Sequence, residues 1–135
     1  MDNTITTILA EARAKSQNYP QYAYLLWQSG IHTYTVEVPT HLITYRGNQA
    51  DQQWVVPGAA IILETSPSPH PFDEAGVKAA LKANQEGKTD FETFLKQIWQ
   101  SGITQYDADL QERKVTYRGA TGKVYAEHFP LAVVK

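Results

Sequence analysis

The chain of 135 residues contains no cysteine. Disulfides, cysteine-based zinc sites and cysteine nucleophiles are therefore excluded together, and the absence fits a reducing compartment. The net charge is only −2, so the sequence lacks the broad positive field on which non-specific nucleic-acid binding depends. We therefore expect no nucleic-acid partner.

Long hydrophobic runs are also missing. The longest nearly apolar stretch, residues 55–63, is far shorter than the roughly 20 residues that a membrane-spanning helix needs. Residues 1–4 lack the basic start and apolar run of a signal peptide. These features predict a cytoplasmic protein with no membrane partner.

The overall composition is that of a folded domain. Hydrophobic residues make up 42% of the chain and charged residues 19%, which is ordinary for a globular protein. A chain of this size buries roughly two-thirds of its unfolded surface without help from metals or disulfides. We expect a single domain spanning residues 1–135.

An internal repeat is present at an offset of 72 residues. The segment WQSGI at 27–31 recurs at 99–103, and TYRG at 44–47 recurs at 116–119. Ten of the 21 positions from 27 to 47 are identical to the position 72 residues later, with no gap. Such self-similarity predicts two diverged copies of one structural unit.

The two copies cover about residues 3–65 and 72–130, and a proline-rich connector, residues 66–71, lies between them. A unit of about 60 residues is only marginally stable alone. We therefore expect the copies to pack with pseudo-twofold symmetry and to share one core.

Each copy begins with two predicted helices. The first helices are expected over residues 3–15 and 73–86, the latter with Asp73 as its N-cap. A capping box formed by Thr89 and Glu92 predicts the start of the last helix.

The second helices carry apolar stripes at helical spacing. Gly30 and Gly102 are expected to end them in the left-handed conformation. Trp27 and Trp99 precede these glycines, and both are expected in the core.

Hairpins follow the helices. Counting outward from the turns pairs Tyr34 with Tyr45 and Tyr106 with Tyr117 on the apolar face. Third strands are expected near residues 53–56 and 123–129, and residues 59–65 read as a further buried strand. The sequence thus predicts an α+β fold of two helix–helix–β-hairpin repeats, with an antiparallel sheet covered by helices on one face.

Motifs that carry chemistry are scarce. None of the four histidines, at 32, 41, 70 and 128, stands in a metal-ligand spacing, so no metal site is expected. No nucleophile elbow, dinucleotide fingerprint or phosphate-binding loop is present, and we expect no cofactor. His70 lies in the connector and His41 beside a turn, where exposed polar residues are normal.

The repeated Tyr-Arg-Gly is the strongest functional signal. Arg46 and Arg118 are expected on the polar face, where two guanidinium groups related by a twofold axis would hold an anionic group. The structural alternative is that each arginine pairs with a nearby carboxylate or carbonyl and closes its hairpin.

Residues that the copies do not share are the other candidates for a ligand or partner site. His32 is replaced by Thr104 and His41 by Arg113, while Trp54 has no counterpart at the 72-residue offset, where Ala126 stands. An unpaired tryptophan is a candidate contact, although burial in the first copy is the alternative.

The second copy also carries a pattern that resembles a family of bacterial domains of unknown function, known as YbcV-like or phage-envelope-protein-like. Asp109 matches that pattern, whereas an aromatic residue is usual where Arg118 stands. The resemblance implies a small α+β domain of prophage origin and supplies no catalytic residues. The motif consists of Thr93-Phe94-Leu95, Gly102-Ile103, Tyr106, Leu110, Val115-Thr116-Tyr117, Gly119 and Gly122.

These features together favour a non-enzymatic binding or protein-interaction domain that acts through the polar sheet face or the cleft between the copies. Its partner is an unknown protein or small molecule, and the chain is a monomer or a homodimer. The alternative is a small hydrolase or isomerase that uses carboxylates and histidines in the same cleft. Its candidate residues are Glu37, Asp107, Asp109, His32 and Glu127.

Overall fold

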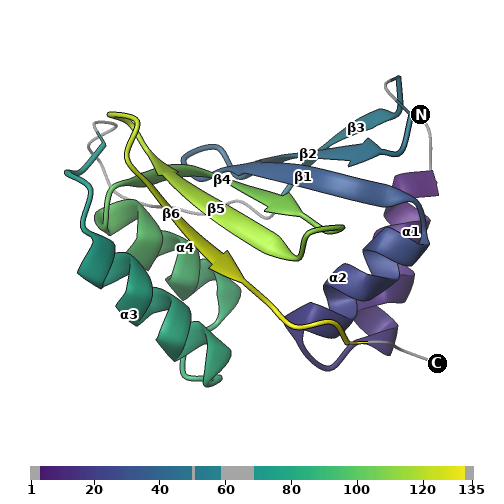
Figure 1. Cartoon of the computed structure of the whole chain (residues 1–135), viewed down its shortest axis with the longest axis horizontal. Helices are drawn as coiled ribbons and strands as arrows, with labels where there is room; N and C mark the ends of the chain where they lie inside the picture. The colour runs from purple at the N-terminus through teal and green to yellow at the C-terminus, as the bar shows by residue number, and fades with distance from the viewer. Residues whose placement is uncertain (1–3, 50, 59–68, 133–135) are drawn as a thin grey trace.

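The structure, a computed structural model, describes residues 4–49, 51–58 and 69–132. Two helices and three strands are followed by two more helices and three more strands (Figure 1). The helices are α1 (Thr4–Lys15), α2 (Tyr19–Gln28), α3 (Glu74–Gln85) and α4 (Phe91–Gln100). The strands are β1 (Ile31–Glu37), β2 (Leu42–Gly47), β3 (Gln53–Pro57), β4 (Ile103–Asp109), β5 (Lys114–Gly119) and β6 (Val124–His128).

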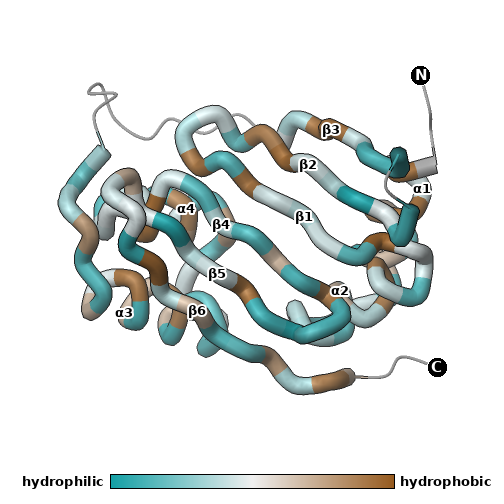
Figure 2. Tube along the Cα trace, turned by 45° about the horizontal axis from the view of Figure 1, so that its top comes forward, coloured by the Kyte–Doolittle hydropathy of each residue, from teal (hydrophilic) through white to brown (hydrophobic). Residues whose placement is uncertain are grey.

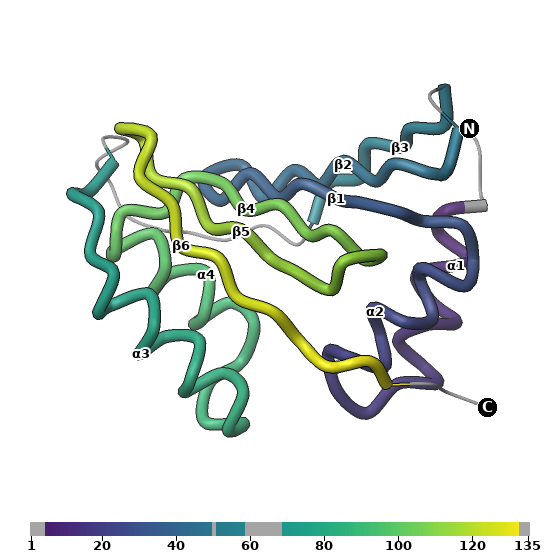
Figure 3. Tube along the Cα trace, in the orientation of Figure 1, coloured from purple at the N-terminus to yellow at the C-terminus, as the bar shows by residue number. Residues whose placement is uncertain are grey.

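The strands form one antiparallel sheet in the order β3-β2-β1-β4-β5-β6. Each half of the chain contributes three neighbouring strands, and β1 and β4 join the halves at the centre (Figure 3). The α+β class and the antiparallel sheet predicted from the sequence are therefore confirmed.

The predicted hairpin register is also confirmed. Tyr34 pairs with Tyr45, and Tyr106 pairs with Tyr117. Every residue pair between β1 and β2 has a counterpart between β4 and β5 exactly one 72-residue offset later. The alternation of apolar and polar residues fixes this register, because a slip of one residue would turn every buried side chain outward.

All four helices lie on one face of the sheet, α1 and α2 under the first half and α3 and α4 under the second (Figure 1). The core lies between the helices and the inner sheet face. The other face, with polar residues along β1, β2, β4 and β5, is crossed by no helix of the described chain (Figure 2). None of these helices has both the length and the apolar composition needed to cross a membrane.

Short polar side chains fix where the helices start. Asn18 caps α2, and Asp73 caps α3 as predicted. The predicted cap at Thr89 is wrong by one residue, because the Asp90 carboxylate accepts a hydrogen bond from the Thr93 backbone N–H and begins α4. A carboxylate is favoured there because the helix N-terminus carries partial positive charge.

The two helix C-termini differ in what covers them. Gly30 and Gly102 both adopt the predicted positive φ, at 97° and 92°. Residues 71–73 pack over Gly102, and the Asp73 N–H donates to the Ser101 carbonyl at 2.8 Å. Trp99 is accordingly 3% exposed.

The corresponding end of α2 carries no such cover from the described residues. Trp27 is 40% exposed there, so its predicted place in the core is wrong. His70, predicted to be exposed, is half-buried with its ring edge-on to Trp99.

The third strands form where predicted, but the 72-residue offset ends at the loop before them. Arg46 pairs with Gln53 and Arg118 with Val124, so the second loop is one residue shorter. Trp54 therefore corresponds to Tyr125, and its predicted lack of a counterpart is wrong. The strand expected over residues 59–65 lies outside the described residues.

Candidate functional site

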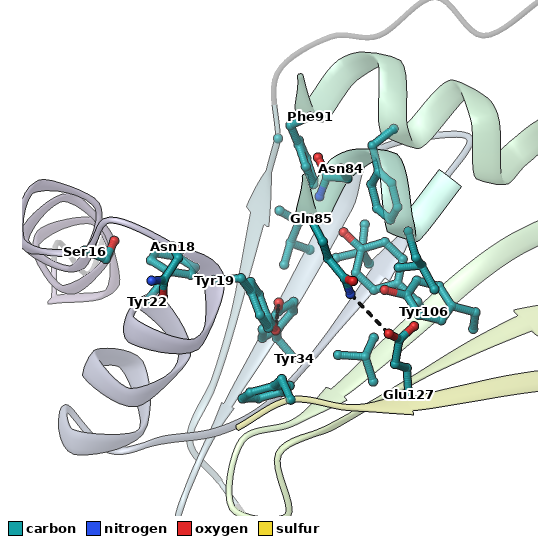
Figure 4. Close-up of a pocket in the computed structure, with 18 of the residues that line it drawn as sticks. Ser16, Asn18, Tyr19, Tyr22, Tyr34, Asn84, Gln85, Phe91, Tyr106 and Glu127 are labelled. Atoms are coloured by element: carbon teal, nitrogen blue, oxygen red, sulfur yellow. Dashed lines mark hydrogen bonds between the residues drawn. The ribbon is translucent and has the colours of Figure 1, made fainter. Parts of the chain in front are cut away.

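A cleft of about 660 Å³ lies between the two helix pairs, beneath the inner strands of the sheet (Figure 4). Protein interiors contain few voids larger than a water molecule. Ligand pockets, in contrast, typically enclose about 300–1,000 Å³. The cleft is therefore the leading candidate site.

Four tyrosines of the sheet form the floor of the cleft. The rings of Tyr34 and Tyr45 have centroids 5.6 Å apart, and those of Tyr106 and Tyr117 lie 5.4 Å apart. All four belong to the buried core. Their tilted cross-strand pairing is a favourable aromatic geometry, and the twofold periodicity of the strands aims all four rings at the helices.

The two walls of the cleft differ in polarity. Tyr19 and Tyr22 line it from α2, and Phe91 and Phe94 line it from α4. Phe94 packs edge-on against Tyr117, with 6.5 Å between centroids. One wall therefore offers hydroxyl groups beside its rings, and the other offers only hydrocarbon.

The tyrosine hydroxyl groups meet within the cleft. Those of Tyr19 and Tyr34 are hydrogen-bonded to each other. The Tyr19 ring is 37% exposed at the mouth, while Figure 4 shows it turned toward Tyr34. Phe129 holds this ring edge-on from the other side, at 5.1 Å between centroids.

Burial raises the pKa of every tyrosine that lines the cleft. The pKa of Tyr34 and of Tyr106 is raised well above the ordinary value. Burial also raises the pKa of Tyr22, although Arg13 and Tyr45 act in the opposite direction. The remaining three are Tyr19, Tyr45 and Tyr117.

These hydroxyl groups therefore stay protonated at neutral pH, because loss of the proton would leave a charge in an apolar space. A protonated hydroxyl both donates and accepts hydrogen bonds. A tyrosine that serves as a general base needs the opposite, a lowered pKa. The cleft is thus equipped to bind polar atoms of a ligand.

Polar side chains mark the rim. The Gln85 amide donates to a Glu127 carboxylate oxygen at 3.1 Å across the space between α3 and β6 (Figure 4). Arg13 of α1 and His41 also line the cleft. His41 was expected at the surface, but it is 4% exposed, since the turn holds it at a φ of 54° and packs its ring near Gly58 and Phe91.

Arg46 and Arg118 lie on the open face of the sheet, away from the cleft. Arg118 pairs with Asp107 through its Nε atom. Arg46 instead donates to the Thr35 hydroxyl at 3.0 Å, and that hydroxyl donates to Asp107 at 2.7 Å. The structural alternative for these arginines thus describes Arg118, whereas Arg46 has a neutral partner.

The remaining predicted residues fall in two places. His32 lies beside Arg46 at a smaller hollow on the open face. Trp54 is half-buried opposite Tyr45 and packs against the core. The structure therefore brings together His32 and Arg46, places His41 alone at the cleft, and separates Trp54 and Arg118 from both.

The sequence reading assigned the paired tyrosines to the scaffold and so missed the floor of the cleft. A usable signal was present. Tyr34, Tyr45, Tyr106 and Tyr117 all occupy positions predicted to face the core, where phenylalanine would pack as well without a hydroxyl to satisfy.

A metal centre finds no support in the part of the chain that is described, because no three histidine or acidic side chains gather in a suitable set. The polar groups of the cleft are mainly hydroxyls and amides. Such groups suit an organic ligand better than a transition metal.

Comparison with known proteins gives a family but no activity. A family model described as "Protein of unknown function (DUF1398)" matches residues 7–128. Uncharacterised proteins of Mycobacterium bovis and of two Mycobacterium tuberculosis strains are each 28% identical over 135 residues. These alignments cover 96% of this chain and 80% of each relative.

Proposed function

Since the chain belongs to the DUF1398 family of proteins of unknown function, we propose from its structure that it is a non-enzymatic binding protein whose ligand occupies the tyrosine-lined cleft. The observation that carries this proposal is the cleft itself, a space of about 660 Å³ floored by four buried tyrosines. Space of this size inside a small domain lowers stability unless something fills it.

The walls define the ligand. Phe91 and Phe94 offer an apolar surface on one side, and Tyr19 and Tyr22 offer hydroxyl groups on the other. The matching ligand is a small, flat, largely apolar molecule with at least one hydrogen-bonding atom on its edge. Aromatic molecules fit best, because their ring edges and faces complement those of the lining side chains.

Binding is favoured over the alternative, a small hydrolase or isomerase, by where the acidic groups lie. Asp107 and Asp109 are on strand positions that face away from the cleft, and Glu37 is exposed. Glu127 and His41 do line the cleft. However, Glu127 pairs beside the β4–β5 turn, whereas His41 lies in the β1–β2 turn at the opposite end of the strands. A shared proton transfer needs groups within hydrogen-bond reach.

Titration with naphthol, an uncharged fluorescent phenol, tests the proposal. We expect saturable binding to one site, followed by the fluorescence of the probe. Phe91→Ser removes one wall at a half-exposed position, and Tyr22→Phe removes one hydroxyl. We expect the first to weaken binding about tenfold and the second less.

Trp27→Ser is the matched control, because Trp27 belongs to α2 and is 40% exposed but does not line the cleft. Its affinity should equal that of the unaltered chain. Equal affinities for all four proteins, or no saturation, would contradict a cleft site.

We also propose that the chain is a duplicated unit whose halves pack around a pseudo-twofold axis. The two hairpins share one register, and the pairing of β1 with β4 runs symmetrically about Thr35 and Asp107, which are themselves 72 residues apart. An experimental structure whose halves superpose best at another offset would contradict the duplication.

A prophage origin and a cytoplasmic location rest on the sequence alone and stay proposals. A structural protein of a phage particle forms large homo-oligomers, whereas a small-molecule binder is expected to be a monomer or homodimer. Size-exclusion chromatography separates these cases, and a clean monomer would contradict a role in a particle.

A further inference from the structure

The open face of the sheet holds a second hollow, of about 260 Å³, on the side opposite the cleft. It forms where β1 and β2 meet the loop that leads to β3. The lining residues are His32, Thr33, Arg46, Gly47, Asn48, Gln49, Gln52 and Gln53.

The lining is rich in hydrogen-bond donors. Arg46 and His32 bring cationic or donating nitrogen atoms, and four amide side chains surround them. None of the eight lining residues is acidic, and Asp51 of the same loop does not line the hollow. A small pocket with this lining favours a negatively charged group.

Arg46 is the centre of this surplus of positive charge. Its single bond to the Thr35 hydroxyl engages one of five guanidinium donors. Within residues 4–49, 51–58 and 69–132 it forms no ion pair. Arg118, the residue 72 positions later, is neutralised by Asp107.

Nearby carboxylates do not supply the missing charge. Asp107 already accepts hydrogen bonds from Arg118 and from Thr35. Asp109 lies two strands from Arg46, roughly 10 Å away by the usual strand spacing. Its carboxylate accepts from two backbone N–H groups in the β4–β5 turn.

We propose that this hollow binds an oxyanion, the phosphate or carboxylate group of a small molecule, with Arg46 as its main ligand and His32 beside it. A guanidinium group matches the oxygen spacing of both anions and binds them through two parallel hydrogen bonds. The site belongs to the first half of the chain alone, because Thr104 stands in place of His32 and Arg118 is already paired.

Amide NMR titrations with inorganic phosphate and with acetate test this site, with sodium chloride at equal ionic strength as the reference. We expect saturable shifts at His32, Asn48 and Gln52 with at least one of the two anions. Stronger binding of phosphate or of acetate tells which oxyanion the site prefers.

Arg46→Gln and Arg118→Gln are the matched variants, since both arginines are exposed on the same sheet face. The first should raise the apparent Kd at least about tenfold, and the second should leave it within about twofold. Equal losses in the two variants, or shifts that sodium chloride reproduces, would overturn the proposal. Neither variant touches the cleft, so naphthol binding should be unchanged in both.

Discussion

Alkaline pH offers the sharpest perturbation of the tyrosine-lined cleft. Burial raises the pKa of Tyr22, Tyr34, Tyr45, Tyr106 and Tyr117 in the folded chain. Unfolded tyrosine releases its proton at about pH 10. Above that pH the unfolded chain loses protons that the folded chain retains, so the stability present below pH 10 falls as pH rises.

The magnitude follows from the number of tyrosines involved. Each protonated tyrosine lowers the free energy of unfolding by up to about 1.4 kcal/mol per pH unit. Five give at most about 7 kcal/mol per unit, leaving out Tyr19, whose ring is more than a third exposed. A domain of this size is stable by about 5–15 kcal/mol. Cooperative unfolding is therefore expected within about one to two pH units above 10.

Ultraviolet absorbance of tyrosinate and near-ultraviolet circular dichroism, recorded along the same pH series, measure this directly. We expect ionisation and loss of tertiary structure in one steep, coincident step. A Tyr45→Phe variant should reduce the steepness by about a fifth. Gradual ionisation with an intact fold would refute the burial of these hydroxyl groups.

Three further predictions concern pairs of equivalent positions and one helix start. Trp99→Ala should lower the free energy of unfolding by about 3–5 kcal/mol in urea, and Trp27→Ala by only about 1–2 kcal/mol, because Trp27 is 40% exposed. Gly102→Ala should cost about 1–3 kcal/mol more than Gly30→Ala, since a Cβ at 102 would lie 2.6 Å from backbone atoms. Asp90→Ala should lower the Tm by removing the cap of α4.

Each comparison has an outcome that would contradict it. Equal losses for the two tryptophans would mean that Trp27 is covered in solution. Equal losses for the two glycines would mean that residues 71–73 do not pack over the end of α4. An unchanged Tm for Asp90→Ala would place the start of α4 elsewhere.

The hairpins could be predicted from sequence because local rules determine them. A period of two along each strand and a short turn between them fix which side chains face inward, as the pairing of Tyr34 with Tyr45 shows. The same reasoning placed Arg46 and Arg118 on the open face. Local alternation carries this information without reference to the rest of the chain.

Burial at the helix ends could not be predicted in this way. Trp27 and Trp99 lie in identical five-residue segments, yet one is 40% exposed and the other 3%. The difference comes from residues 71–73, which pack over Gly102 but have no counterpart among the described residues at Gly30. Tertiary contacts from a connector decide it, and the repeat itself contains no record of them.

The functional surfaces were similarly divided by long-range geometry. The arginines were expected as a symmetric pair, but Thr35 stands where symmetry would place a second aspartate, so only Arg118 gains a carboxylate. The cleft depends on the distance between two helix pairs, which no local pattern specifies. What the sequence did contain was tyrosine at inward-facing positions.

Chemical-shift mapping of naphthol on the unaltered chain tests the central claim most directly. The account predicts saturable shifts confined to the inner face of the sheet near Tyr34 and Tyr106 and to the facing sides of α2 and α4. The open face around Arg46 should not respond. Shifts centred on the open face or on Trp27, or none that saturate, would contradict a ligand site in the cleft.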